Sequence, residues 1–377
     1  MNAPSDLPNS ATPGIASRQE MYRAVRRTTE QLAAPLSAED CALQSMPDAS
    51  PTKWHLAHTS WFFETFLLEP SLRAYRAFHP QFRVLFNSYY NAVGDKHPRP
   101  ERGMLSRPSL EEVYAYRRHV DAAMLDWLAR SHADQALGLF TLGLNHEQQH
   151  QELILMDIKH LLSRNPLHPA YSRAPARTPS AEIAPLRWHQ HAAGLYEVGH
   201  AGAEFAFDNE SPRHPIWLPD FALASRLITN GEYLQFMQDG GYARPELWLS
   251  EGWDAVNAQQ WRAPLYWLQR DGQWQHFTLH GLEPIALSDP VQHVSFFEAE
   301  AFAQWASQQS QWEGARLPTE FEWEVAAGRQ ASRTHRRARR RSAGSGRLPP
   351  SRRSPCRAQS SRRSARRRSA SRPGCRR

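Results

Sequence analysis

The spacing of three histidines is the strongest chemical signal in this sequence. His146 and His150 lie four residues apart in HEQQH, a spacing that puts two rings on one face of a helix, about one turn apart. His58 lies in KWHLAHTSWFF, with Trp54 and Phe62 on the same expected helix face. Imidazole nitrogens are common ligands of transition metals. We therefore expect His58, His146 and His150 to meet inside a helical domain and to bind one metal ion.

Other interpretations of these histidines stay open. Any one of them could be a core histidine held only by a hydrogen bond. HEQQH also matches the zinc-peptidase pattern H-E-x-x-H, in which Glu147 would be the general base. The extended form of that motif needs a third histidine ten residues after the first, where this chain has Met156. A zinc hydrolase and a noncatalytic metal-binding or nucleic-acid-binding remnant remain the alternatives.

Neighbouring residues predict the direction in which the rings point. Leu142, Gly143 and Leu153 share a helix face with the HEQQH histidines, so this face should lie against the rest of the domain. His55 is expected to be an exposed neighbour or a residue behind the ligands rather than a fourth ligand.

Four helices are expected to position these residues. Pro51 suits a helix start, and Ser109 with Glu112 forms a capping box ahead of the third helix. The first 163 residues therefore predict an up-and-down four-helix bundle. The expected helical segments are 18–33, 51–68, 113–130 and 133–163.

The chain of 377 residues is long enough for two cores. Five prolines without helical or strand periodicity mark an interdomain linker, after which short segments separated by Gly, Pro and Asn predict an irregular α+β domain. We expect a disordered leader (1–17), a helical bundle (18–163), a proline-rich linker (164–187), an incomplete α+β domain (188–331) and a disordered Arg/Ser-rich tail (332–377).

Composition excludes several classes of protein. The first 17 residues hold no Lys, Arg or apolar run, so they lack the features of a secretion signal. No stretch reaches the roughly 20 apolar residues that span a bilayer. Three cysteines are too few for a disulfide framework or a cysteine-based zinc site. We expect a cytoplasmic protein that does not contact a membrane.

The net charge of +7 combines two unlike segments. Residues 332–377 hold 18 arginines and no acidic or aromatic residue, and without them 27 basic residues face 38 acidic ones, a balance of −11. Such a tail cannot bury enough apolar area to fold. It could be a nucleic-acid-binding arm, a natural extension or the product of out-of-frame translation. Its use of Arg without Lys favours out-of-frame translation, so no specific nucleic acid is expected as a partner.

Several blocks together resemble one family. KWHLAHTSWFFETFLL, NSYYNAVGDKHPRPERGMLSRPSLEEV and LNHEQQHQELILMDIKH are similar to the DinB-like bundle of hercynine oxygenases, the sulfoxide synthases of ergothioneine biosynthesis. The blocks FDNESPRHPIWLPDFALASRLITNGEYLQF, HVSFFEAEAFAQWA and RLPTEFEWEVAA resemble the formylglycine-generating-enzyme-like (C-type-lectin-like) domain of the same proteins. The resemblance covers roughly residues 20–328 and implies an α+β protein with these two domains.

The resemblance also implies a chemistry. It maps iron(II) ligands onto His58, His146 and His150, carboxylate contacts of the thiol substrate onto Arg99 and Arg102, and a hercynine contact onto Gln149. The family joins the sulfur of γ-glutamylcysteine, or of cysteine, to the imidazole of hercynine with O2, giving a sulfoxide. Three neutral histidine ligands would leave the iron its full +2 charge and leave coordination positions open for a thiolate and for oxygen.

The departure from the family lies at the C-terminus. There the family has a Gly/Trp-rich stretch that supplies substrate contacts and a catalytic tyrosine, where this chain has the arginine tail. No residue is therefore assigned to the tyrosine role. Our hypothesis is a frameshift near Gly328, which would leave the metal site in place and make turnover doubtful. A gene that lacks a Gly/Trp-rich continuation in its other two frames would contradict it.

Overall fold

The computed structural model describes residues 15–88, 90–130, 136–173 and 183–328. The described residues up to Trp323 belong to one compact unit, and Glu324–Gly328 belong to a second. The helical bundle and the small sheets both belong to the first unit. The expected leader and arginine tail lie outside the described residues, apart from the last residues of the leader segment, Ile15–Ser17, which begin the first helix.

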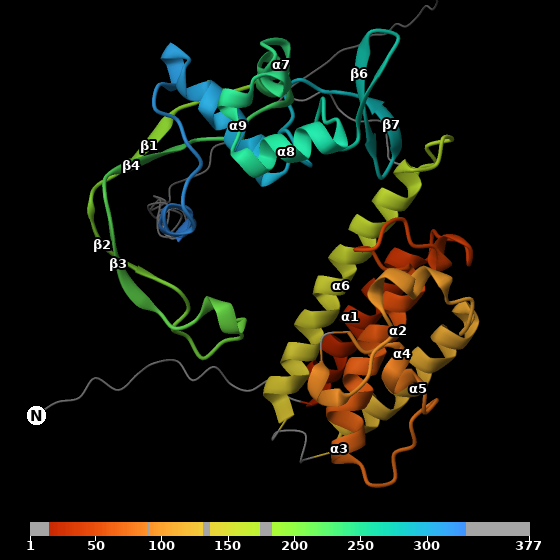
Figure 1. The fold of residues 1–377 in the computed structure, drawn as a ribbon. Coiled ribbons are helices and arrows are strands. Elements are labelled where there is room, and N and C mark those ends of the chain that lie inside the picture. Colours follow the sequence, from red (N-terminus) through yellow and green to blue (C-terminus); the bar gives the residue numbers. More distant parts are fainter. Residues whose placement is uncertain (1–14, 89, 131–135, 174–182, 329–377) are drawn as a thin grey trace, which may run out of the picture. The chain divides into compact units, whose positions relative to one another are not determined.

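The N-terminal part is a helical bundle (Figure 1). Its core contains α2, which packs against both α5 and α6, while α1 packs against α6. The expected capping box is present, since Ser109 Oγ accepts from the Glu112 N–H and the Glu112 side chain accepts from the Ser109 N–H. The helices are α1 (Ile15–Ala33), α2 (Thr52–Phe63), α3 (Glu69–Ser71), α4 (Phe82–Leu85), α5 (Leu110–Leu128) and α6 (Leu137–Ser163).

Helix α2 is buried on every side. All of its residues, Thr52–Phe63, are buried, and it continues into a π-helical turn at Glu64–Leu68. Leu56, Trp61 and Phe63 are 0% exposed and lie in the main core of the bundle. A helix with this much apolar surface must sit in the middle of a domain. Its polar side chains, His55 and His58 among them, therefore need partners inside the protein.

A glycine allows α6 to approach α2 closely. A Cβ atom on Gly143 would lie 2.6 Å from Cε1 of Phe63 and 2.9 Å from Cε1 of Phe62. The expected inward direction is therefore correct for Gly143. It is wrong for Leu142, which is 36% exposed, because the buried stripe of α6 runs through Phe140, Gly143 and Glu147 instead.

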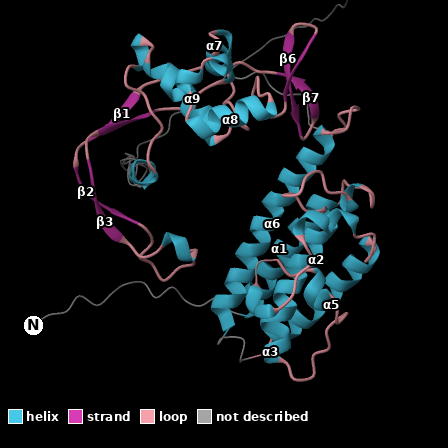
Figure 2. Cartoon of the chain, viewed as in Figure 1, coloured by secondary structure: helices cyan, strands magenta, loops and turns pink. Residues whose placement is uncertain are grey.

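The second part mixes small antiparallel sheets with short helices (Figure 2). Strand β1 pairs with β4, β2 pairs with β3, and β5, β6 and β7 form a three-stranded sheet. A core of aromatic residues that includes Tyr233, Phe236 and Trp305 joins α7 to α9. The strands are β1 (Trp188–His191), β2 (Gly194–Val198), β3 (His214–Leu218), β4 (Phe221–Ala224), β5 (Trp267–Arg270), β6 (Gln273–Thr278) and β7 (Gly281–Pro284), and the helices are α7 (Asn230–Gln238), α8 (Ser250–Gln259) and α9 (Phe296–Ser307). The expected α+β class is confirmed.

One local motif, Arg-Leu-x-Thr-x-x-Glu, occurs twice and folds in the same way each time. In the first copy Arg226 binds both oxygens of Glu232 at 2.9 and 2.7 Å, and Glu232 also accepts from the N–H of Thr229. In the second copy Arg316 binds Glu322 at 2.8 and 2.6 Å, with Thr319 in the place of Thr229. Each copy is thus a capping box reinforced by a bidentate ion pair.

None of the described helices has both the length and the apolar character needed to cross a membrane.

Candidate metal centre

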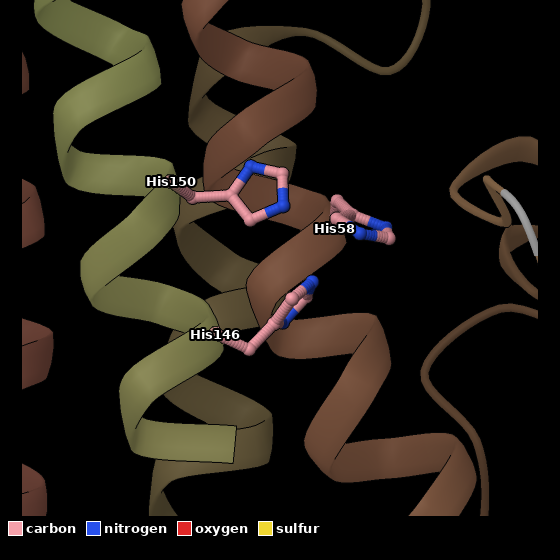
Figure 3. A group of neighbouring side chains, drawn as sticks. All are labelled: His58, His146 and His150. Carbon is pink, nitrogen blue, oxygen red and sulfur yellow. The ribbon is translucent and has the colours of Figure 1, made fainter. Parts of the chain in front are cut away.

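Three histidines of the bundle converge. His58 comes from α2 and His146 and His150 from α6, and Figure 3 shows the three rings turned toward one another. One nitrogen from each ring lies within 4.8 Å of the others. The spacing of four residues in HEQQH and the close approach of α2 and α6 together account for this arrangement.

His58 is held by a backbone hydrogen bond and by two indole rings. Its Nδ1 lies 2.6 Å from the carbonyl oxygen of Phe86. Because a carbonyl only accepts, Nδ1 carries the proton and Nε2 carries the lone pair in the neutral ring. Trp54 and Trp61 both stack on His58. Their ring centroids lie 4.5 Å and 5.3 Å from that of His58, and each ring plane is inclined by 15° to it. The ring therefore has a fixed orientation and a free ligand atom.

His150 is held by another histidine. Its Nδ1 lies 2.8 Å from Nδ1 of His55, whose Nε2 lies 3.0 Å from Oδ2 of Asp157. His55 is 2% exposed, so the expectation of an exposed residue is wrong. Its hydrogen bond to His150 fits the other expectation, a residue behind the proposed ligands. Asp157 was missed in the sequence, although it lies seven residues after His150, on the same face of α6.

His146 has an unsatisfied nitrogen. Its Nδ1 is buried and has no hydrogen-bond partner within the part of the chain that the structure describes. The ring packs on Phe62 at 4.8 Å. Burial, which disfavours the imidazolium, lowers the pKa of His146 to about 4. A buried imidazole nitrogen without a partner is costly unless a ligand takes it.

The site keeps its histidines neutral. Burial is the largest cause of the lowered pKa of His58 and of His150, and the neighbouring histidines and the charge of Arg102 add to it. Neutral imidazole is the form that binds metals. Converging lone pairs and a buried nitrogen without a partner are thus the features that a transition-metal ion would satisfy, and the donor set fits iron(II).

Glu147 is part of a buried ion cluster. Its oxygens accept from Arg26 at 2.8 Å, Arg117 at 3.0 Å and Thr29 at 2.7 Å. Burial alone would raise the pKa of Glu147, but the charges of Arg26 and Arg117 lower it to about 2. A carboxylate so engaged and so weakly basic does not suit a general base. The zinc-peptidase interpretation of HEQQH therefore loses its catalytic residue.

The three residues expected to contact substrate differ in access. Arg99 is partly exposed and donates to the carbonyl of Asp48, and Gln149 is exposed on α6. Arg102 is 4% exposed and donates to Ser50 Oγ at 2.9 Å and Ser88 Oγ at 3.3 Å.

Arg102 also belongs to the aromatic stack around His58. Its guanidinium carbon lies 3.4 Å from the ring centre of Trp54, which in turn stacks on His58. Arg102 thus packs on the Trp54 indole, and this indole in turn holds the His58 ring in its orientation.

Comparison with known proteins identifies the two parts of the chain. The DinB superfamily profile matches residues 21–160. The profile of the sulfatase-modifying factor enzyme 1-like domain matches residues 191–364.

Relatives match most of the length of this chain. A hercynine oxygenase of Mycolicibacterium thermoresistibile is 31% identical over 315 residues, which cover 83% of this chain and 67% of that protein. The chain belongs to the hercynine oxygenase family. The family member of Mycobacterium tuberculosis is 34% identical over 295 residues, 77% of this chain and 64% of the relative. This chain spans about two thirds of the length of the family members that it matches.

The second part is also similar to enzymes outside the family. The formylglycine-generating enzyme of Bos taurus is 29% identical over 172 residues, 41% of this chain and 44% of that protein. The family assignment therefore confirms the expected architecture, a DinB-like bundle followed by a formylglycine-generating-enzyme-like domain.

Proposed function

We propose that this protein is a non-haem iron(II) enzyme that uses O2 to form a C–S bond between hercynine and γ-glutamylcysteine, or cysteine, giving a sulfoxide in ergothioneine biosynthesis. The observation that carries the proposal is the convergence of three neutral histidines, one with a nitrogen that lacks a partner, in a member of the hercynine oxygenase family. The same proposal assigns the reaction to the cytoplasm.

In this proposal His58, His146 and His150 would hold the iron. When bound, iron(II) supplies positions for a thiolate and for oxygen and takes part in the electron transfer between them. The protein keeps the imidazoles neutral by burial, and it fixes the ring of His58 between Trp54 and Trp61. A set of ligands ordered in advance avoids reorganisation when metal and substrate arrive.

Substrate contacts are proposed for Arg99, Arg102 and Gln149. Arg99 is partly exposed and Gln149 is exposed, and a guanidinium group and an amide are chemically suited to a carboxylate and to hercynine. Arg102 is 4% exposed, and a direct contact with a carboxylate needs its guanidinium to exchange Ser50 or Ser88 for the ligand. Its role in the stack on Trp54 does not depend on that exchange.

The test is anaerobic reconstitution of the full chain with iron(II), followed by O2, hercynine and γ-glutamylcysteine or cysteine. Mass spectrometry should detect a coupled sulfoxide that is absent with His146→Ala and present with His160→Ala, a change at a half-buried histidine outside the site. Absence of product from the wild type would refute the proposed activity, and equal product from both variants would refute the proposed site.

A further inference from the structure

A chain of three hydrogen-bonded side chains leads away from one proposed ligand. Nδ1 of His150 lies 2.8 Å from Nδ1 of His55, and Nε2 of His55 lies 3.0 Å from Oδ2 of Asp157. The same Asp157 oxygen accepts from the backbone N–H of Ser50 at 2.8 Å. His55 is 2% and His150 8% exposed, so these bonds form where little water competes.

The acceptors set the direction of each proton in this chain. A carboxylate oxygen accepts, so Nε2 of His55 donates to Asp157. A neutral imidazole has one N–H, and Nδ1 of His55 must therefore accept from the Nδ1–H of His150. The lone pair of His150 is then on Nε2, the nitrogen that remains for a ligand.

We propose that His55 and Asp157 are positioning residues that fix His150 in the tautomer whose Nε2 binds the metal. The inference rests on the three-histidine site proposed above. The carbonyl of Phe86 does the same for His58, so two of the three ligands have their tautomer set by the protein alone. Partners of this kind typically change metal affinity about 10–100-fold.

Two substitutions of similar size separate hydrogen bonding from packing. His55→Asn keeps an acceptor close to the position of the His55 Nδ1, whereas His55→Leu removes it. Cobalt(II) affinity of the full chain, followed by visible absorption, should fall about 10–100-fold with Leu and about 3-fold or less with Asn. His160→Leu is the control, because His160 is on the same helix and bonds to Ser45 Oγ at 2.7 Å instead. It should leave the affinity unchanged.

A second measurement needs no metal. Long-range ¹H–¹⁵N correlation NMR of the histidine-labelled, metal-free full chain identifies the protonated nitrogen of His150. Wild type and His55→Asn should show Nδ1–H, and His55→Leu a mixture of tautomers. The proposal is wrong if wild-type His150 carries its proton on Nε2, or if His55→Leu binds cobalt as tightly as wild type. A wild type that binds no cobalt would instead refute the metal site, and a His55→Leu variant that does not fold leaves the wild-type NMR result to decide.

Discussion

Arg117 and Glu147 form an ion pair at 3.0 Å in which both side chains are 0% exposed. Glu147 is the residue directly after the proposed ligand His146, and it also binds Arg26. Two buried guanidinium groups thus share one fully buried carboxylate, and each also pairs with a more exposed one, Arg26 with Asp121 and Arg117 with Glu30. Such a cluster is stable when complete and costly when one member is removed, because the remaining charges stay buried.

Glu147→Gln should therefore destabilise the protein by about 3–5 kcal/mol, as expected for a broken buried ion pair. Urea unfolding followed by tryptophan fluorescence measures the loss. Glu152→Gln is the matched control, because Glu152 is exposed on the same helix and should change stability little. A Glu147→Gln variant that unfolds like the wild type but loses hydrolytic activity would favour the zinc-hydrolase alternative instead.

Gly143→Ala should weaken both the bundle and the metal site. The new Cβ would lie 2.6 Å from Phe63, so α6 has to move away from α2, at a cost of about 1–3 kcal/mol. Cobalt(II) affinity should fall with it, because these two helices carry the three histidines. Gly138→Ala, where nothing lies within 4 Å of the added Cβ, is the control in the same helix. Equal affinity and stability of the two variants would contradict the close packing of α2 and α6.

The second Arg-Leu-x-Thr-x-x-Glu motif should make stability depend on acidity. Hydrogen bonds from Arg316 are the largest cause that lowers the pKa of Glu322 to about 2, below its ordinary value of about 4.3. A carboxyl group whose pKa is lowered by folding stabilises the folded protein at any pH above its ordinary pKa. This stabilisation is lost as the pH falls toward about 2.

Glu322→Gln should then lower the free energy of unfolding near pH 7, measured by urea unfolding, by about 1 kcal/mol, as for a lost helix cap. The difference from wild type should shrink toward about pH 2. A difference that stays constant over this range would show that the Glu322 charge is not the cause.

Cys41 should resist alkylation in the folded protein. The residue is 0% exposed, and burial, with a contribution from Asp40, raises the pKa of its thiol to about 12. At about pH 8 only roughly one thiol in 10⁴ would be ionised. Iodoacetamide labelling and peptide mass spectrometry should find Cys41 unmodified until urea is added. Rapid labelling without urea would mean that the connection between α1 and α2, which contains Cys41, opens in the folded protein.

Sequence reasoning predicted that the three histidines meet, but it did not predict which residues hold them in place. The HEQQH spacing, the position of His58 in an apolar helix and the Ser109–Glu112 cap are local patterns, and the structure bears out the convergence and the cap. Asp157 and His55 are far apart in the chain and meet only through the packing of α2 on α6. A single spacing could not predict that contact.

The sequence also could not predict which of Arg99 and Arg102 is exposed or which residues pair with Glu147. Arg99 and Arg102 look alike in RPERG, yet Arg102 is buried against Trp54 and Arg99 is partly exposed. Glu147 in a zinc-peptidase pattern pairs instead with arginines from α1 and α5. These differences depend on tertiary contacts, which override what short motifs indicate.

The most direct test of the account is an anaerobic iron(II) titration of the full chain by equilibrium dialysis. We compare the wild type with His58→Ala, His146→Ala, His150→Ala and the control His160→Ala. The account predicts one iron per chain in the wild type and in His160→Ala, and loss of that iron in each of the other three variants. Iron binding that is absent from the wild type, or equal in all five proteins, would contradict the three-histidine metal centre.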